Sequence, residues 1–157
     1  MLETHEEVLF GEEQETGFFE WMKEMVEDYY EGEKDLIVFS NSLMDGDELR
    51  KGIFPSVQIY PDGDSFERKN ERTMIHEITI SLAISTKGPK KETFRESTRM
   101  AEELYTYFKN VVPRIGPIKD PPIEGNIEYT WEGFHRKKHR NQQMSHSKIA
   151  LTYRFRC

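Results

Sequence analysis

Histidine and cysteine are the residues of this chain whose types could bind a metal or act as nucleophiles near neutral pH. Two of its five histidines, His135 and His139, stand four residues apart within FHRKKHRNQQMSH, residues 134–146. A metalloprotease helix combines such a pair with a glutamate, which is missing here. Three adjacent cations separate the two histidines instead and would repel a divalent metal. We expect no metal site in this stretch.

The other candidates for chemistry have plainer interpretations. His76 stands on the apolar side of an alternating segment, where a hydrogen-bonded core histidine is favoured over a catalytic one. An enzyme with a site built from His76, Glu77 and aspartates stays open as an alternative. The sole cysteine, Cys157, is the last residue, so it offers no disulfide framework and no cysteine zinc site within one chain, and it indicates a reducing compartment.

Sequence motifs for nucleotide, serine or calcium chemistry are missing. Neither GxGxxG nor GxxxxGK occurs, and no serine stands in a nucleophile elbow. The two DGD triplets, residues 45–47 and 62–64, do not continue into an EF-hand loop and indicate turns. We therefore expect a protein that is not an enzyme and that binds no cofactor.

The basic cluster in residues 134–146 stands out because the chain as a whole is acidic, with a formal net charge of -7. Residues 1–35 contain thirteen Asp or Glu, whereas residues 133–157 contain none and have seven Lys or Arg. The cluster has three interpretations, which are a solvated hairpin tip, a protein contact and a nucleic-acid contact. Only Phe134 could stack on a base there, which disfavours nucleic acid.

We predict that the cluster contacts protein, because opposite charges at the two ends of one chain suit contacts between successive copies. The candidate assembly interface comprises a basic set and an acidic set. Its members are Arg136, Lys137, Lys138, His139 and Arg140 on one side and Glu12, Glu13 and Glu15 on the other.

Length and composition favour one folded domain. The 157 residues are enough to bury a core without disulfides, and 12% aromatic residues are too many for a disordered chain. No apolar run approaches the about 18 residues that span a bilayer, and the N-terminus lacks the basic start of a signal peptide. We expect a flexible acidic arm in residues 1–16 and a single domain in residues 17–157, without a membrane partner.

Two segments have the periodicity of amphipathic helices. Apolar residues recur every three or four positions after Gly17, with Thr16 as the expected N-cap and Gly32 as the expected end. The same spacing returns over about residues 92–112, where Thr93 and Glu96 predict a capping box. A proline-rich connector follows this second helix.

Strands are predicted at residues 36–40, 54–60, 73–86, 127–131 and 148–156. The alternation in residues 73–86 is the strongest, and its even-numbered residues should form the buried face. Pro61, Asp62 and Gly63 predict a chain reversal between the second and third strands.

These elements predict an α+β fold, a mostly antiparallel sheet of four to five strands with two main helices packed on one face. The candidate core residues come from both helices and the strands. They are Trp21, Met25, Ile78, Ile80, Leu82, Leu104, Phe108, Trp131, Leu151 and Tyr153.

Three strand patterns in this order resemble those of a known family. They are P-x-V-x-I from Pro55, E-x-x-I-x-L-x-I from Glu77 and I-x-L-x-Y from Ile149. With the helix between the second and third, this layout resembles the tail terminators of long-tailed bacteriophages, the minor tail proteins of the lambda type, over residues 17–156. The resemblance rests on layout and strand patterns, without a catalytic signature.

The resemblance implies a structural virion protein, assembled in the host cytoplasm and located in the tail or neck. Such proteins form a homo-oligomeric ring, expected to be hexameric, that caps the tail tube, ends tail polymerisation and forms the head-tail joining surface. The implied partners are the tail tube protein and a head-tail connector or head-closure protein, with DNA passing through the lumen without specific binding. Another neck protein, a head-closure or tail-completion protein, and a small monomeric adaptor protein remain the alternatives.

Overall fold

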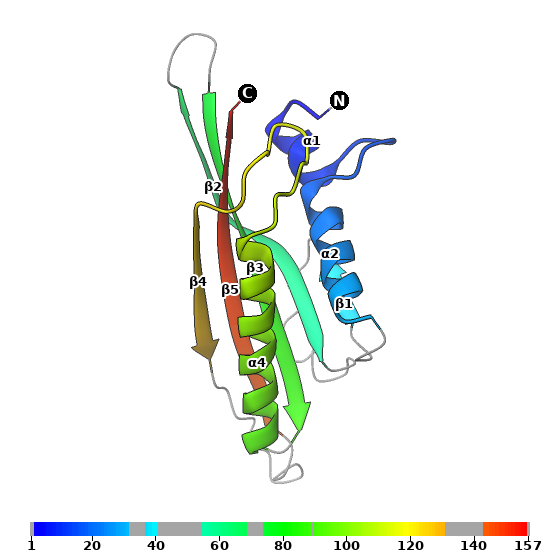
Figure 1. Cartoon of the computed structure of the whole chain (residues 1–157), viewed down its shortest axis with the longest axis vertical. Coiled ribbons are helices and arrows are strands. Elements are labelled where there is room, and N and C mark those ends of the chain that lie inside the picture. Colours follow the sequence, from blue (N-terminus) through cyan, green and yellow to red (C-terminus); the bar gives the residue numbers. More distant parts are fainter. Residues whose placement is uncertain are drawn as a thin grey trace.

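The protein folds around a five-stranded sheet, seen in a computed structural model that describes residues 2–31, 37–40, 55–68, 74–88, 90–130 and 143–156 (Figure 1). The strand order is β1-β2-β3-β5-β4. β1 and β2 are parallel, and the other neighbouring pairs are antiparallel. The elements are α1 (His5–Phe10), α2 (Phe18–Tyr29), β1 (Ile37–Ser40), β2 (Ser56–Arg68), β3 (Met74–Gly88), α4 (Lys90–Lys109), β4 (Glu124–Thr130) and β5 (Gln143–Arg156).

The predicted α+β class is confirmed, with a mostly antiparallel sheet and two main helices, α2 and α4, on one of its faces (Figure 1). Side chains of a strand alternate between the two faces of its sheet. The even-numbered residues Ile78, Ile80, Leu82 and Ile84 of β3 are fully buried, and they face the helices. Burial of this apolar stripe supplies the main driving force for packing the two layers.

The core lies between the sheet and the helices. Of the ten residues expected there, the fully buried ones are Ile78, Ile80, Leu82, Leu104, Phe108, Leu151 and Tyr153. Trp21 and Met25 are partly buried and pack against this core from α2. Trp131 lies outside the described residues.

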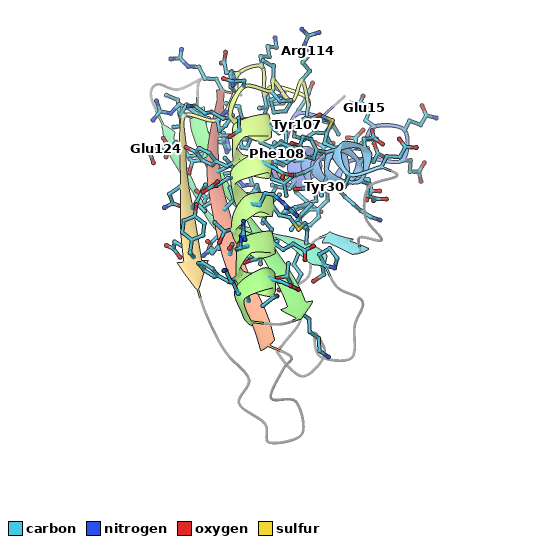
Figure 2. The ribbon with its side chains drawn as sticks, turned by 60° about the horizontal axis from the view of Figure 1, so that its bottom comes forward. Glu15, Tyr30, Tyr107, Phe108, Arg114 and Glu124 are labelled. Atoms are coloured by element: carbon cyan, nitrogen blue, oxygen red, sulfur yellow. The ribbon has the colours of Figure 1, made fainter. Side chains whose placement is uncertain are left out.

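Aromatic rings join α2 to α4. The rings of Trp21 and Phe108 meet edge to face with centroids 6.0 Å apart, and the ring centroids of Tyr29 and Tyr107 are 4.9 Å apart. Figure 2 shows Tyr30 on the side of α2 that faces Tyr107 and Phe108 of α4. The Tyr30 hydroxyl donates a hydrogen bond to Glu103 of α4 at 3.1 Å. These contacts fix the two helices against each other as well as against the sheet.

The N-terminal segment differs from the flexible arm that the sequence predicts. Residues 5–10 form α1, whose N-cap Thr4 and third residue Glu7 make a reciprocal capping box. Hydrogen bonds from Thr4 hold the pKa of the Glu7 carboxyl below its ordinary value. Leu2, Val8 and Leu9 are buried in the main core. Burial of these three apolar side chains offsets the entropy lost when the segment is ordered.

The predicted chain reversal at Pro61 to Gly63 is wrong. β2 continues through these residues to Arg68, and its pairing with β3 shifts between Pro61 and Asp64. Such an irregularity is typical of a β-bulge, which uses the same residue types as a turn. Gly63 has a φ of +118°, which residues with a Cβ rarely adopt. The described part of β3 begins only at Met74.

The ends of α2 and the start of α4 differ from their predicted positions. α2 has Gly17 as its N-cap, with no side-chain cap bond, and its C-cap is Tyr30. α4 begins at Lys90, so Thr93 lies inside the helix. The Thr93 hydroxyl donates to the hydroxyl of Thr86 at 2.7 Å, which ties the helix to β3 instead of capping it.

Candidate functional site

The sheet face opposite the helices consists of polar pairs across neighbouring strands. Arg154 of β5 donates to Glu77 of β3, with Nε 3.0 Å from Oε1. The hydroxyls of Thr79 and Thr152 are 2.9 Å apart on the same two strands. Paired polar groups of this kind suit a surface that faces water or a flat protein partner.

Asp62 connects three strands on this face. Its Oδ2 lies 2.7 Å from Nζ of Lys148 on β5 and accepts a hydrogen bond from Ser81 of β3, also at 2.7 Å. The Lys148 and Ser81 hydrogen bonds hold the pKa of the Asp62 carboxyl below its ordinary value. The Asp62 carboxylate in turn raises the pKa of the Lys148 ammonium. The bulge in β2 thus places a carboxylate where a turn was expected.

β4 is the last strand in the sheet order, and no described strand pairs with its outer edge. Ile123, just before this strand, is 44% exposed, and Tyr129, within it, is 42% exposed. Both values are high for large apolar side chains. The Tyr129 hydroxyl donates to Glu102 of α4 at 3.2 Å, and burial together with this bond raises the pKa of Tyr129. An exposed strand edge can accept a strand or side chains from another protein molecule.

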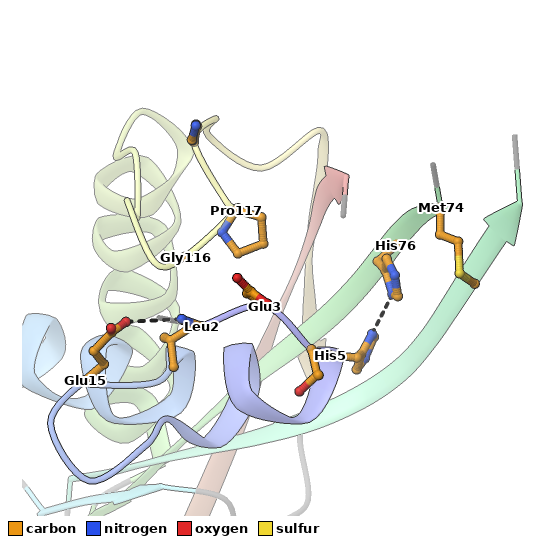
Figure 3. A pocket seen from close by; sticks show the side chains of 10 residues that line it. Leu2, Glu3, His5, Glu15, Met74, His76, Gly116 and Pro117 are labelled. Carbon is orange, nitrogen blue, oxygen red and sulfur yellow. Dashed lines mark hydrogen bonds between the residues drawn. The ribbon is translucent and has the colours of Figure 1, made fainter. Parts of the chain in front are cut away.

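A cavity of about 860 Å³ lies where the N-terminal segment meets the start of β3 and the connector after α4 (Figure 3). His5 and His76 both line it and contact each other directly, with their Nδ1 atoms 3.0 Å apart. The His76 ring stacks on Phe155 with centroids 4.9 Å apart. Nearby, the backbone N–H of Leu2 donates to Oε2 of Glu15 at 3.2 Å. The cavity is lined by Leu2, Glu3, Thr4, His5, Glu15, Met74, His76, Gly116, Pro117 and Lys119.

The His76 imidazole has a lowered pKa because burial disfavours its charged form and because positive charge on His5 repels it. Its Nδ1 faces another imidazole, so the pair can share or exchange a proton. Among the described residues, no group of three or more His, Cys, Asp or Glu side chains could hold a metal ion. No helix in the described parts of the chain is long and apolar enough to cross a membrane.

The predicted acidic residues Glu12, Glu13 and Glu15 are exposed in the short connection between α1 and α2. The backbone N–H of Glu12 donates to the carbonyl of Glu15 at 2.9 Å, which closes this connection into a small loop. Further exposed acids continue along α2, and they are Glu20, Glu24, Glu27 and Asp28. The predicted basic residues Arg136, Lys137, Lys138, His139 and Arg140 lie outside the described residues.

Two features were not recognised in the sequence. The capping box of α1 could have been found, because Thr4 and Glu7 have its spacing and the apolar Val8 and Leu9 follow. The contact between His5 and His76 spans 71 positions, and no local pattern indicates it.

The comparisons with known proteins do not identify a family. No protein-family model matches this chain, and no curated protein is significantly similar to it. The function is therefore inferred from the chain's own residues.

Proposed function

We propose that this protein is a structural virion protein, a tail terminator that caps the phage tail tube as a ring. In this role it ends tail polymerisation and forms the head-tail joining surface. The observation that supports the proposal best is the ordered acidic surface formed by the α1–α2 connection and by α2. Because the N-terminal segment packs on the core, its exposed carboxylates have fixed positions and can form a defined docking surface.

The C-terminal part of the chain provides positive charge that complements the acidic surface. Residues 133–157 have seven Lys or Arg and no acid. When two different surfaces of one protein attract each other, each copy binds the next head to tail, and a suitable rotation closes the chain of copies into a ring. We propose that Arg136, Lys137 and Lys138 of one copy dock on the acidic surface of its neighbour or on the tube protein.

The polar face of the sheet and the open edge of β4 fit this role, because a face of paired polar groups and an exposed strand edge are both suited to protein contact. DNA would pass through the lumen of the ring without specific binding. The proposed partners are therefore further copies of the chain, the tail tube protein and a connector or head-closure protein, in a virion assembled in the host cytoplasm.

Solution mass tests the ring directly. Sedimentation velocity of the purified chain should show one closed oligomer, expected to contain six copies, either alone or when tail tube protein is added. A ring that binds the head connector and ignores the tube would favour the alternative of a head-closure or tail-completion protein. A stable monomer that ignores both would favour a small adaptor protein.

A further inference from the structure

The His5–His76 contact joins two parts of the chain that could otherwise separate. His5 is the first residue of α1, and His76 lies near the start of β3. Figure 3 shows the two rings directed at each other, with the hydrogen bond between their Nδ1 atoms drawn. Phe155 of β5 lies behind both rings, with centroids 4.9 Å from His76 and 6.0 Å from His5.

α1 is a marginal element without such contacts. It has only six residues, and isolated helices of this length are unstable in water. Val8 and Leu9 are buried on one side of the helix, and Leu2 packs against Gly116 in the connector after α4. The histidine pair adds a polar contact between His5, at the start of α1, and His76 of β3. Loss of that contact would weaken the docking of a segment that is held mainly by its three buried apolar side chains.

Protonation changes the contact in two steps. In the neutral pair, one Nδ1–H donates to the bare Nδ1 of the other ring. With one added proton, an imidazolium still donates to a neutral imidazole, so the hydrogen bond persists. With two added protons, both Nδ1 atoms carry hydrogen and neither can accept. Two positive charges then face each other at a contact distance of 3.0 Å.

We propose that His5 and His76 form a pH-sensitive latch that holds α1 on the sheet near neutral pH and releases it when both imidazoles are protonated. The released segment would expose Leu2, Val8 and Leu9 together with the core surface that they cover. This inference does not depend on the proposed virion role, because it concerns only the docking of the chain on itself.

The surroundings of the pair influence double protonation in both directions. The charged groups that line the same cavity are the carboxylates of Glu3 and Glu15 and the ammonium of Lys119. β3 contributes Met74 and β5 contributes Phe155. Glu77, Arg154 and Arg156 alternate to the other face of the sheet. The acids favour the charged pair, whereas Lys119 and the Phe155 ring disfavour it.

The sign of the pH effect follows from the lowered pKa of His76. A histidine whose pKa is lower in the docked state binds protons more readily when α1 is released. Docking is therefore strongest above the ordinary imidazole pKa of about 6.5 and weakens as the pH falls below it. Because the two imidazoles are coupled, the apparent pKa values of the release describe the pair and not either histidine alone.

Hydrogen exchange of the full chain at pH about 7.5 to 5 tests the latch, with rates corrected for the intrinsic pH dependence. In the wild type, amides of residues 5–10 should lose protection below pH about 6.5, by up to tenfold per pH unit for each proton taken up. Amides of β3 and α4 should stay protected over the same range.

A substitution at His5 provides the decisive comparison. In His5→Gln the amide oxygen accepts from His76 whether or not His76 is charged, so the acid release should become weaker and less steep than in the wild type. His146→Gln is the matched control, because His146 lies on the opposite sheet face beside Ser85, 2.8 Å from its hydroxyl, and should leave the release unchanged.

Two results would overturn the latch. They are constant protection of α1 in the wild type, and acid release of His5→Gln at the wild-type pH and with the wild-type steepness. If His5→Gln does not fold, proton NMR titration of the wild-type imidazoles decides instead. Coupled two-step titration of His5 and His76 supports the latch, and independent single-step titration contradicts it.

Discussion

Two buried tyrosines illustrate how differently one residue type contributes to the core. The Tyr30 hydroxyl donates to Glu103, whereas the Tyr153 hydroxyl has no hydrogen-bond partner among the described residues. Burial raises the pKa of both phenols, with Glu103 raising that of Tyr30 further, so both stay protonated at neutral pH. The hydroxyl of Tyr153 therefore costs desolvation without a compensating bond.

We predict opposite effects for removing the two hydroxyls. Tyr30→Phe should lower the free energy of unfolding by about 1 kcal/mol, because a hydrogen bond is lost. Tyr153→Phe should raise it by about 1 kcal/mol or leave it unchanged, because only an unpaired polar atom is removed. Urea denaturation of both variants measures the difference, and equal losses in the two would contradict this account of the core.

Asp62 gives a prediction for the pH dependence of stability. Its pKa is lowered in the folded protein, so its contribution to stability is present above the unfolded pKa of about 3.9 and is lost as the pH falls through the folded value. The side chain is 37% exposed, so solvent screens the Lys148 pair. Asp62→Asn should therefore lower the free energy of unfolding by less than about 1 kcal/mol at pH 7.

The difference between this variant and the wild type should shrink as the pH falls through the folded pKa of Asp62, because the carboxylate loses its charge there. Urea denaturation over a series of pH values from 7 downward checks this. A deficit that stays constant with pH would show that the carboxylate charge is not what Asp62 contributes.

At the scale of elements, the sequence predicts well those parts whose pattern extends over many residues. The alternation in β3 and the helical spacing in α4 cover 15 and 20 residues, and both elements are present with shifted ends. α1 escaped prediction because six residues give too short a period, and its order depends on Leu2, Val8 and Leu9 fitting a distant core. The bulge at Pro61 to Gly63 was mistaken for a turn because both structures favour the same residues.

The loop between α1 and α2 depends on two glycines in close contact. A Cβ on Gly17 would lie 2.3 Å from the backbone nitrogen of Gly11 and 2.7 Å from the carbonyl oxygen of Leu9. Gly11 has a φ of +82° and is equally crowded, by Glu15 and Gly17. Backbone atoms cannot yield as a flexible side chain does, so the segment must move if a methyl group is added.

We predict that Gly17→Ala lowers the free energy of unfolding by about 1–3 kcal/mol through this overlap. Thr16→Ala is the matched control, because the cap of α2 is Gly17 and Thr16 is exposed. It should change stability by less than about 0.5 kcal/mol. Thermal unfolding of both variants distinguishes this structure from the sequence-based expectation of a Thr16 cap, in which Thr16→Ala would be the costly change.

At the scale of the whole molecule, the sequence predicts the separation of acidic and basic residues along the chain. It does not predict that the acidic segment is ordered and presents its carboxylates on a fixed surface. The exposed acids of α2 and of the α1–α2 connection are held in place by the buried side chains of the same segment. Whether a charged segment is ordered depends on its apolar residues, and Leu2, Val8 and Leu9 seemed too scattered to form a packed side.

We predict that reversing Arg136, Lys137 and Lys138 to Glu weakens assembly and makes its remaining strength less dependent on salt, while monomer folding is unchanged. A matched control reverses three exposed lysines elsewhere, Lys91, Lys109 and Lys119, with the same change of net charge. Light scattering over a salt series compares the two. Unchanged assembly of the first variant, or equal losses in both, would contradict a specific role for the basic cluster.

The growth of tail tubes tests the central claim most directly. Tube protein polymerising in the presence of the purified chain should stop at shorter lengths as the chain's concentration rises. Negative-stain electron microscopy should then show a ring at one end of each tube. Tubes of unchanged length with bare ends, together with a chain that stays monomeric, would contradict the proposal that this protein terminates tails.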